Sequence, residues 1–140
     1  MQTFVPFPDL KISAQILDMR RLGKQRVETF QLLRVNHGLV SGWSNHPAAK
    51  MWRGHNGGLI AYGVAICEEW IARGYKDTCL DKILEFGHAS THDMPQWWGD
   101  ERVHASHRAN LLRKDGDYYG QFGWTDSPDM PYFWPTEVSA

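Results

Sequence analysis

The sequence predicts a small all-α domain: one compact helical unit with an extended N-terminal arm and an irregular, aromatic C-terminal tail. Apolar residues recur at spacings of three and four, as in helices, and no segment of useful length alternates between polar and apolar residues as a strand does. Capping residues and glycines separate the helical stretches. A chain of 140 residues has the size of a single domain, and we expect residues 1–140 to form one.

The N-terminal part of the chain combines an arm with a long helix. Residues 1–8 contain two prolines and are predicted to be extended. Asp9 is a suitable N-cap for a helix that continues to about Asn36, and Gly38 is a stop signal. Gly23 lies inside this helix and indicates either a break or a close approach of another segment.

The middle of the chain is predicted to contain two helices after a loop. A short helix covers residues 46–54, HPAAKMWRG, with its proline near the start. Asn56 can cap a longer helix that ends at Gly74. The apolar stripe of this longer helix consists of Ile60, Val64, Cys67 and Ile71.

Two further helices and the tail complete the prediction. The sequence TCLD at residues 78–81 resembles a capping box for a helix that ends near Phe86. Asp100 can cap a helix over residues 101–114. Residues 115–135 are rich in aromatic residues, glycine and proline, so they are predicted to be non-helical and to lie across the helices as a strap.

Charge is distributed unevenly, although the formal net charge is only −1. Residues 1–60 hold eight Lys and Arg against three acids, while residues 61–140 hold seven against thirteen. This asymmetry indicates a polyanion bound on one side of the molecule. The alternative is chance clustering of charges on solvated faces.

The sequence also carries features that indicate a cellular location. Its two cysteines, Cys67 and Cys79, form no CxxC motif, as expected in a reducing compartment. The N-terminus lacks the basic and apolar segments of a secretion signal, and no apolar run approaches the roughly 20 residues of a membrane span. We therefore expect a cytoplasmic, monomeric protein with no membrane partner.

The segment RRLGKQRVETF, residues 20–30, places four cations within seven residues of the predicted first helix. At 100° per residue, one side of that helix carries Arg21, Lys24, Gln25 and Glu28. The predicted core stripe consists of Met19, Leu22, Phe30 and Leu33. Phosphate groups can bind at Arg20, Arg21 and Lys24. The alternative is an ordinary solvated face with helix-spaced Arg21–Gln25 and Lys24–Glu28 pairs.

Arg26 falls in the middle of the predicted core stripe. It needs partners there, because an unpaired buried guanidinium is very costly. One interpretation is a structural ion pair with Asp18 or with an acid elsewhere. The other is that Arg26 lines a pocket.

Two histidine pairs have a spacing of about one helical turn, which is compatible with metal binding: His88 with His92, and His104 with His107. No cysteine pair or HExxH motif accompanies them, so we expect no metal and no other cofactor. The His107-Arg108 pair can hold a phosphate or orient a substrate, or it is simply part of a helix surface. Walker loops, GxSxG motifs and Rossmann fingerprints are absent from the sequence.

Several strings of the sequence together resemble a known family. They are MQTFVPFPD, LDMRRLGKQRVE, HPAAKMWRG, and VHASHRANLLRKDGDYYGQFGW followed by PYFWP. These strings span nearly the whole chain and resemble the bacterial and phage family of pyrimidine-dimer DNA glycosylases, with a more remote likeness to the phage enzyme endonuclease V. The resemblance implies a compact all-α fold that binds double-stranded DNA, kinks it and flips a nucleotide.

The resemblance also implies a mechanism. In the phage member, the α-amine of the chain attacks the sugar carbon C1′, the base leaves, and an imine links enzyme and DNA. A carboxylate on the first helix assists, and β-elimination then cuts the strand. An α-amine suits this chemistry because its ordinary pKa is about 8, well below that of lysine. Residue 2 here is Gln, whose bulk disfavours removal of Met1, so the implied nucleophile is the Met1 amine.

Site residues are carried over where the motifs match. The phage enzyme has its catalytic Glu in an R-E-L-P-R stretch, whereas the matching residues 21–26 contain Gln25 and no acid, and Glu28 is the nearest carboxylate. The predicted catalytic residues are Met1, Gln25, Arg26 and Glu28. The predicted DNA-binding residues are Arg20, Arg21, Lys24, Lys50, Arg53 and Arg108. The predicted pocket residues are Gln2, His46, His104 and His107.

Four functional hypotheses follow. The leading one is a DNA glycosylase with abasic-site lyase activity on damaged or modified pyrimidines. An alternative enzyme keeps the fold but acts on another modified base or on a free nucleoside or nucleotide. A third hypothesis is a non-catalytic DNA-binding module, and a fourth is a structural protein supported by zinc.

Overall fold

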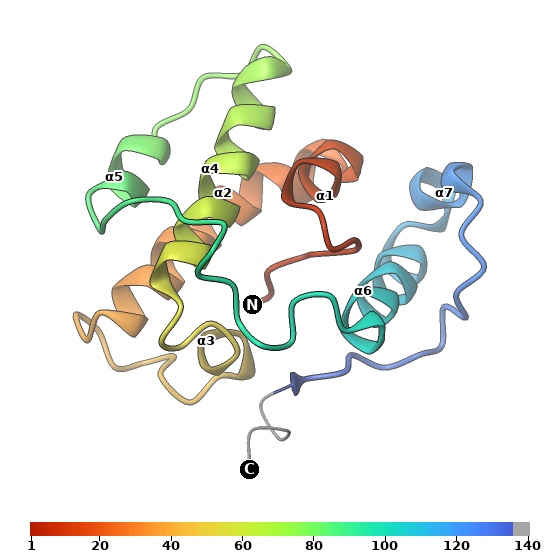
Figure 1. Ribbon diagram of the computed structural model, residues 1–140. Coiled ribbons are helices and arrows are strands. Elements are labelled where there is room, and N and C mark those ends of the chain that lie inside the picture. Colours follow the sequence, from red (N-terminus) through yellow and green to blue (C-terminus); the bar gives the residue numbers. More distant parts are fainter. Residues whose placement is uncertain (136–140) are drawn as a thin grey trace.

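The computed structural model describes residues 1–135, and in this range it consists of helices and loops with no assigned strand, which confirms the all-α prediction (Figure 1). The helices in chain order are α1 (Leu10–Ile16), α2 (Met19–Asn36), α3 (Pro47–Lys50), α4 (Asn56–Ala72), α5 (Leu80–Leu84), α6 (Glu101–Lys114), α7 (Gly116–Tyr119) and the 3-10 helix η1 (Gly120–Phe122). Within residues 1–135, none of these helices is long and apolar enough to cross a membrane.

The N-terminal arm, residues 1–8, runs through the centre of the molecule (Figure 1). On one side of the arm, α2 lies along α4, which also contacts α1 and α5. On the other side, α6 contacts the arm through side chains that bind the backbone of Val5 and Pro6. Phe4 and Val5 are buried members of the hydrophobic core. The arm therefore joins the two parts of the helix assembly instead of lying on its surface.

The predicted first helix is two helices, which corrects the sequence-based boundary. Leu17 has an extended backbone and ends α1, and Asp18 then caps α2 by accepting a hydrogen bond from the Arg21 N–H. The break is therefore at residues 17–18 and not at Gly23. A Cβ atom at Gly23 would lie 3.0 Å from the Trp70 ring, so this glycine permits a close approach of α4 to α2.

Helix caps explain most of the other boundaries. Asp9 and Asp100 accept the backbone hydrogen bonds expected of N-caps, which confirms both predictions. The predicted capping box at 78–81 is wrong, because the Asp77 side chain accepts the N–H groups of Cys79 and Leu80 at 3.1 and 2.7 Å. His55, rather than Asn56, occupies the N-cap position of α4.

The tail is only partly irregular. Asp115 accepts a hydrogen bond from the Tyr118 N–H and so opens α7, which continues into η1; residues 116–122 are therefore helical, contrary to the prediction. The segment that follows lies against α6, where Arg108 binds Asp126 and Arg113 donates to the carbonyl of Pro128. This part is the expected strap.

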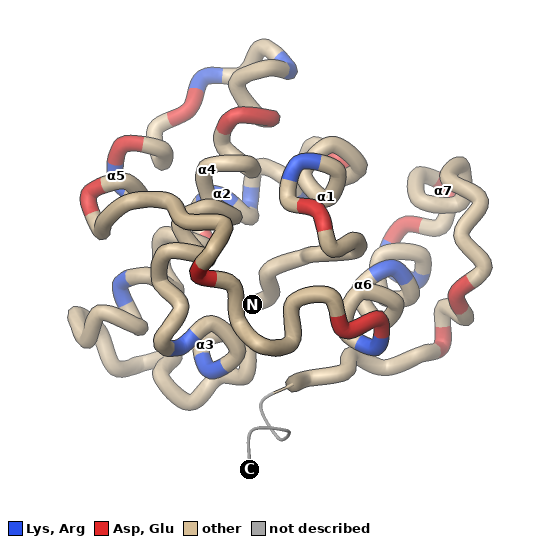
Figure 2. The backbone as a smooth tube through the Cα atoms, viewed as in Figure 1, with Lys and Arg blue, Asp and Glu red and all other residues tan. Residues whose placement is uncertain are grey.

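The acidic residues of the second half of the chain lie mostly at the periphery of the fold. Some occupy the C-terminal end of α4, α5 and the segment after η1, and others lie in the loop before α6 and at both ends of α6, as Figure 2 shows. Basic residues of α2 face a different part of the molecule, next to the N-terminus.

Candidate active site at the N-terminal arm

The first residues of the arm are fixed by one side chain of α2, that of Gln25. Its amide oxygen accepts the Phe4 N–H at 3.0 Å and the Tyr62 hydroxyl at 2.6 Å. Its amide nitrogen donates to the Gln2 carbonyl at 2.8 Å and to Glu28 Oε2 at 3.2 Å. The oxygen and the nitrogen of the buried Gln25 amide are thus both hydrogen-bonded, and these bonds hold the arm and orient Glu28.

Two histidines of α6 bind the next peptide of the arm. The Val5 N–H donates to His107 Nδ1 at 2.9 Å, and the Val5 carbonyl lies 2.7 Å from His104 Nδ1. The Gly99 N–H donates to His104 Nε2, so the His104 proton is on Nδ1 and points to the arm. Burial lowers the pKa of both rings, that of His107 to about 3, so both are neutral near pH 7.

Glu28 is a buried carboxylate beside the first residue of the chain. Its Oε2 accepts the Gln2 N–H at 3.1 Å, and its Oε1 lies 3.6 Å from Lys24 Nζ. The Met1 amine is separated from the Gln2 nitrogen only by the Met1 Cα and carbonyl carbon. The carboxylate thus contacts the backbone one residue away from the primary amine of the chain.

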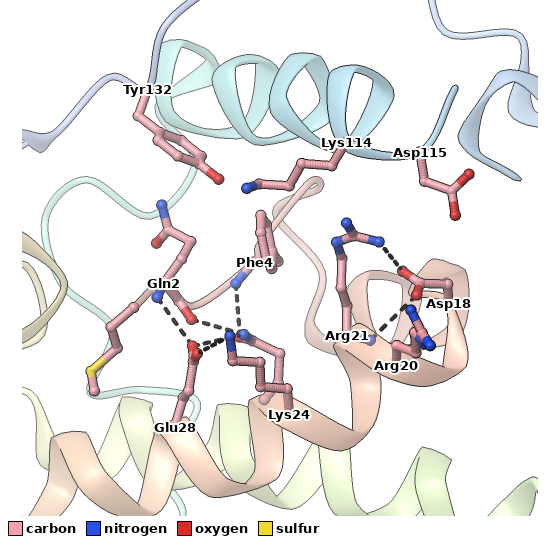
Figure 3. Close-up of a pocket in the computed structure, with 12 residues that line it drawn as sticks. Gln2, Phe4, Asp18, Arg20, Arg21, Lys24, Glu28, Lys114, Asp115 and Tyr132 are labelled. Atoms are coloured by element: carbon pink, nitrogen blue, oxygen red, sulfur yellow. Dashed lines mark hydrogen bonds and ion pairs between the residues drawn. The ribbon is translucent and has the colours of Figure 1, made fainter. Parts of the chain in front are cut away.

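These groups line a cavity of about 490 Å³ between α2, the arm, the end of α6 and the tail (Figure 3). Its wall is formed by Met1, Gln2, Phe4, Asp18, Arg20, Arg21, Lys24, Gln25, Glu28, Lys114, Asp115 and Tyr132. Four of these side chains are cationic and three are carboxylates; Arg21 lies 3.2 Å from Asp18, and Lys24 lies 3.6 Å from Glu28. Such a cavity suits an anionic, elongated ligand such as a phosphodiester.

The structure brings together half of the residues predicted for the site. The cavity wall includes the predicted catalytic residues Met1, Gln25 and Glu28, the predicted pocket residue Gln2, and the predicted DNA-binding residues Arg20, Arg21 and Lys24. Gln25 and Glu28 were expected on a face of α2 open to solvent or phosphate, but they are buried because the arm covers them. Met19, expected in the core stripe, is exposed instead.

Arg26 does not line this cavity. Its guanidinium donates to Asp77 at 2.8 Å and lies over the Trp70 ring, 4.4 Å from the ring centre. Hydrogen bonds from Arg26 and from two backbone N–H groups outweigh burial and lower the pKa of Asp77. The geometry is that of the structural ion pair that was the alternative interpretation of Arg26.

Arg108, expected to bind DNA, is engaged within the fold. It donates to the Pro6 carbonyl at 2.8 Å, and it forms ion pairs with Glu101 and Asp126. His104 and His107, expected in the pocket, lie beneath the arm and are fully buried. These three residues of α6 hold the arm in place.

The remaining predicted residues belong to the α3 region. Lys50 and Arg53 are exposed there, outside the cavity wall, and Arg53 donates to the Ser44 carbonyl. His46 caps α3 by accepting the Ala48 N–H at 3.0 Å. Burial lowers the pKa of His46, and the positive charge of the Met1 amine lowers it further.

Sequence reasoning missed five residues of the cavity wall: Phe4, Asp18, Lys114, Asp115 and Tyr132. Burial opposes ionisation of Asp18, but hydrogen bonds from Tyr119 and Arg21 prevail and lower its pKa. Lys114 and Tyr132 reach the cavity from α6 and the tail, and no local motif signals that approach. Among residues 1–135, no three His, Cys, Asp or Glu side chains converge as ligands for a metal ion.

Comparison with known proteins gives one match. A family model described as pyrimidine dimer DNA glycosylase matches residues 1–83, more than half of the chain. No curated protein and no solved structure matches the chain. The matched segment contains the arm and α2, and with them Met1, Gln25 and Glu28.

Proposed function

The chain belongs to the pyrimidine dimer DNA glycosylase family, and from this premise we propose that it excises damaged or modified pyrimidines from duplex DNA through the amine of Met1. The observation that carries the proposal is that the buried Glu28 carboxylate accepts the N–H of Gln2, the residue next to that amine, in a cavity lined by Met1 and by four cationic side chains. The proposed enzyme is also an abasic-site lyase, because the same amine forms an imine with the sugar.

The amine is the proposed nucleophile. Its nitrogen attacks C1′ of the sugar while the bond from C1′ to the base breaks, and the base leaves with that electron pair and takes up a proton. Opening of the sugar ring at the C1′–O4′ bond gives the imine, with a proton delivered to O4′. Loss of the C2′ proton then expels the phosphate at C3′ and cuts the strand.

Glu28 is the proposed carrier of these protons. Its carboxylate accepts the Gln2 N–H at 3.1 Å, one residue from the amine, and we assign to it the proton that the amine loses and the return of that proton to the sugar oxygen. Gln25 is the proposed positioning residue, because its amide binds both the Gln2 carbonyl and Glu28. The carboxylate function that the phage enzyme has at the matching stretch is thus assigned here to Glu28.

Binding of the DNA backbone is assigned to the cations of the cavity. Arg20, Arg21 and Lys24 project from one side of α2, and Lys114 faces them from the end of α6 (Figure 3). Each cation that neutralises a phosphate releases counterions, so affinity should fall steeply with salt. Bound phosphates at this position would place a flipped nucleotide beside the amine.

Borohydride trapping tests this function. One duplex contains a cyclobutane thymine dimer, a second contains an abasic site, and a third is undamaged. We expect a covalent adduct and strand cleavage with the first two and neither with the third. Absence of an adduct and of cleavage on both damaged duplexes would contradict the proposal. An adduct on the abasic duplex alone would restrict it to lyase activity and redirect the search to other modified bases.

A further inference from the structure

The loop between α2 and α3 carries an exposed tryptophan, Trp43. This residue is 48% exposed, while the other six tryptophans of the chain are buried or half-buried. Tryptophan is largely buried in most folds. A single exposed apolar side chain needs no explanation by itself, so the surroundings of the Trp43 ring decide what it indicates.

The loop holds Trp43 in a fixed position. The His46 N–H donates to the Trp43 carbonyl at 3.0 Å, and the Ser44 N–H donates to the Ser41 carbonyl at 3.2 Å. Arg53 donates to the Ser44 carbonyl from the segment after α3. The Trp43 ring itself lies edge-on to the His46 ring, with centroids 5.4 Å apart. A hydrogen-bonded turn therefore presents the ring to solvent, so little conformational freedom is lost when a ligand binds to it.

Two cations accompany this ring. Lys50 ends α3 and Arg53 follows it, and both side chains are exposed (Figure 2). Residues 29–67 contain no Asp or Glu, and within residues 1–135 neither cation forms an ion pair with a carboxylate. We call Trp43, Lys50 and Arg53 the α3 surface. Cations that neutralise phosphates beside an aromatic ring that stacks on a base are the combination that binds single-stranded nucleic acid.

The α3 surface adjoins the cavity at the arm through a row of aromatic side chains. The His46 ring lies edge-on to the Trp134 ring, with centroids 6.1 Å apart. The Trp134 ring lies 5.4 Å from the Tyr132 ring, and Tyr132 lines the cavity. The three residues of the α3 surface are not part of the cavity wall. The surface is therefore a separate site that neighbours the cavity.

We propose that the α3 surface binds a segment of single-stranded DNA, with an unpaired base stacked on Trp43 and phosphates neutralised by Lys50 and Arg53. The inference rests on the proposed function and adds a second contact with DNA, outside the cavity in which the base is excised. A base inside an intact duplex is already stacked on its neighbours, so an exposed protein ring selects unpaired bases. Displacement of a nucleotide into the cavity opens the duplex. The α3 surface then holds unpaired nucleotides next to the opening.

The two kinds of contact respond differently to salt and to sequence. Stacking on an aromatic ring tolerates every base, because every base has a flat face. It displaces no counterions, so it does not depend on salt concentration. Each phosphate contact with a single strand instead contributes about 0.7 to the slope of log affinity against log salt. The contribution of Trp43 can therefore be separated from that of Lys50.

The test is the binding of a labelled short oligothymidylate to the full chain, followed by fluorescence anisotropy at several salt concentrations. Trp43→Ala should weaken binding about fivefold to a hundredfold with an unchanged salt slope. Trp43→Phe keeps a flat ring and should recover most of that loss. Lys50→Gln should reduce the slope by about 0.7. Phe122→Ala is the matched control, because it removes a ring of η1 that is 37% exposed and outside the α3 surface, and it should bind as the wild type does.

Thermal unfolding separates a binding defect from a folding defect. Trp43 does not belong to the hydrophobic core, so Trp43→Ala should unfold near the wild-type midpoint. If that variant does not fold, the salt slope of Lys50→Gln tests the proposal, and an unchanged slope would overturn it.

Two other outcomes would also overturn the α3 surface: wild-type affinity in Trp43→Ala, or an equal loss in Trp43→Ala and Phe122→Ala. Borohydride trapping by the wild-type protein decides the proposed function separately. Trapping on a damaged duplex without binding of oligothymidylate would overturn the α3 surface alone. Binding of oligothymidylate without trapping or cleavage on either damaged duplex would overturn the proposed function, and with it the link of the α3 surface to excision.

Discussion

Gln25 and Arg26 are adjacent on α2, but their side chains enter two different environments. Arg26 points toward α4 and the loop before α5, where it pairs with Asp77 and lies over Trp70. Gln25 points toward the arm, where it fixes the backbone of Gln2 and Phe4 at the edge of a cavity. One side of the helix stabilises the fold, and the other presents chemical groups to a ligand. The position of a polar residue on a helix therefore does not show whether it stabilises the fold or faces a ligand until the segment that packs against it is known.

The largest effect is expected on the arm side, from Glu28→Gln. The amide keeps the size of the side chain and an oxygen that can accept the Gln2 N–H, but it cannot carry a proton. Loss of a general acid–base group lowers rates by about 10² to 10⁴. Single-turnover cleavage of an abasic duplex should fall within that range while the circular dichroism spectrum is unchanged. Wild-type rates in this variant would remove Glu28 from the mechanism.

On the opposite side of α2, Arg26→Met should affect stability and spare the chemistry. It leaves Asp77 buried without its partner, and breaking such a pair costs about 3–5 kcal/mol. The measurement is the free energy of unfolding by urea, with activity expressed per folded molecule under conditions where the variant is folded. A large loss of activity without a loss of stability would place Arg26 in the site after all.

Acid should weaken the attachment of the arm to α6. The folded-state pKa of His107 is about 3, below the ordinary 6.5, so in this interval the unfolded chain binds a proton that the folded chain does not. The contribution of His107 to the free energy of unfolding is fully present above pH 6.5. It is lost as the pH drops toward 3, by up to about 1.4 kcal/mol per pH unit. The lowered pKa of His104 acts in the same direction. Urea titrations between pH 4 and 8 measure the slope, and a flat profile would contradict the buried neutral rings.

The smallest effect is expected for single cations of the cavity rim. Arg20→Gln should weaken binding to undamaged duplex a few-fold and reduce the slope of log affinity against log salt by about 0.9. Arg34→Gln removes an exposed arginine from the same helix, outside the cavity wall, and is the matched control. Equal effects of both changes would mean that DNA is bound by the general charge of α2 and not at the cavity.

The sequence predicted features that depend on local hydrogen bonds and missed those that depend on tertiary contacts. Asp9 and Asp100 were recognisable as caps because an N-cap acts within a few residues. The helical angles correctly placed Gln25 and Glu28 on the side opposite the core stripe, but the angle cannot show that the arm covers them. No sequence pattern indicated that Lys114 and Tyr132 line the cavity, because α6 and the tail meet α2 only in the folded chain.

The most direct test of the account is the position of the trapped adduct. After borohydride reduction with the thymine-dimer duplex, peptide mapping by tandem mass spectrometry identifies the amine that carries the sugar. The cavity contains three candidates: the α-amine of Met1 and the side-chain amines of Lys24 and Lys114. We predict that the sugar is on the Met1 α-amine. An adduct on Lys24 or Lys114 would contradict the central claim, because Glu28 and the arm would then serve a different nucleophile.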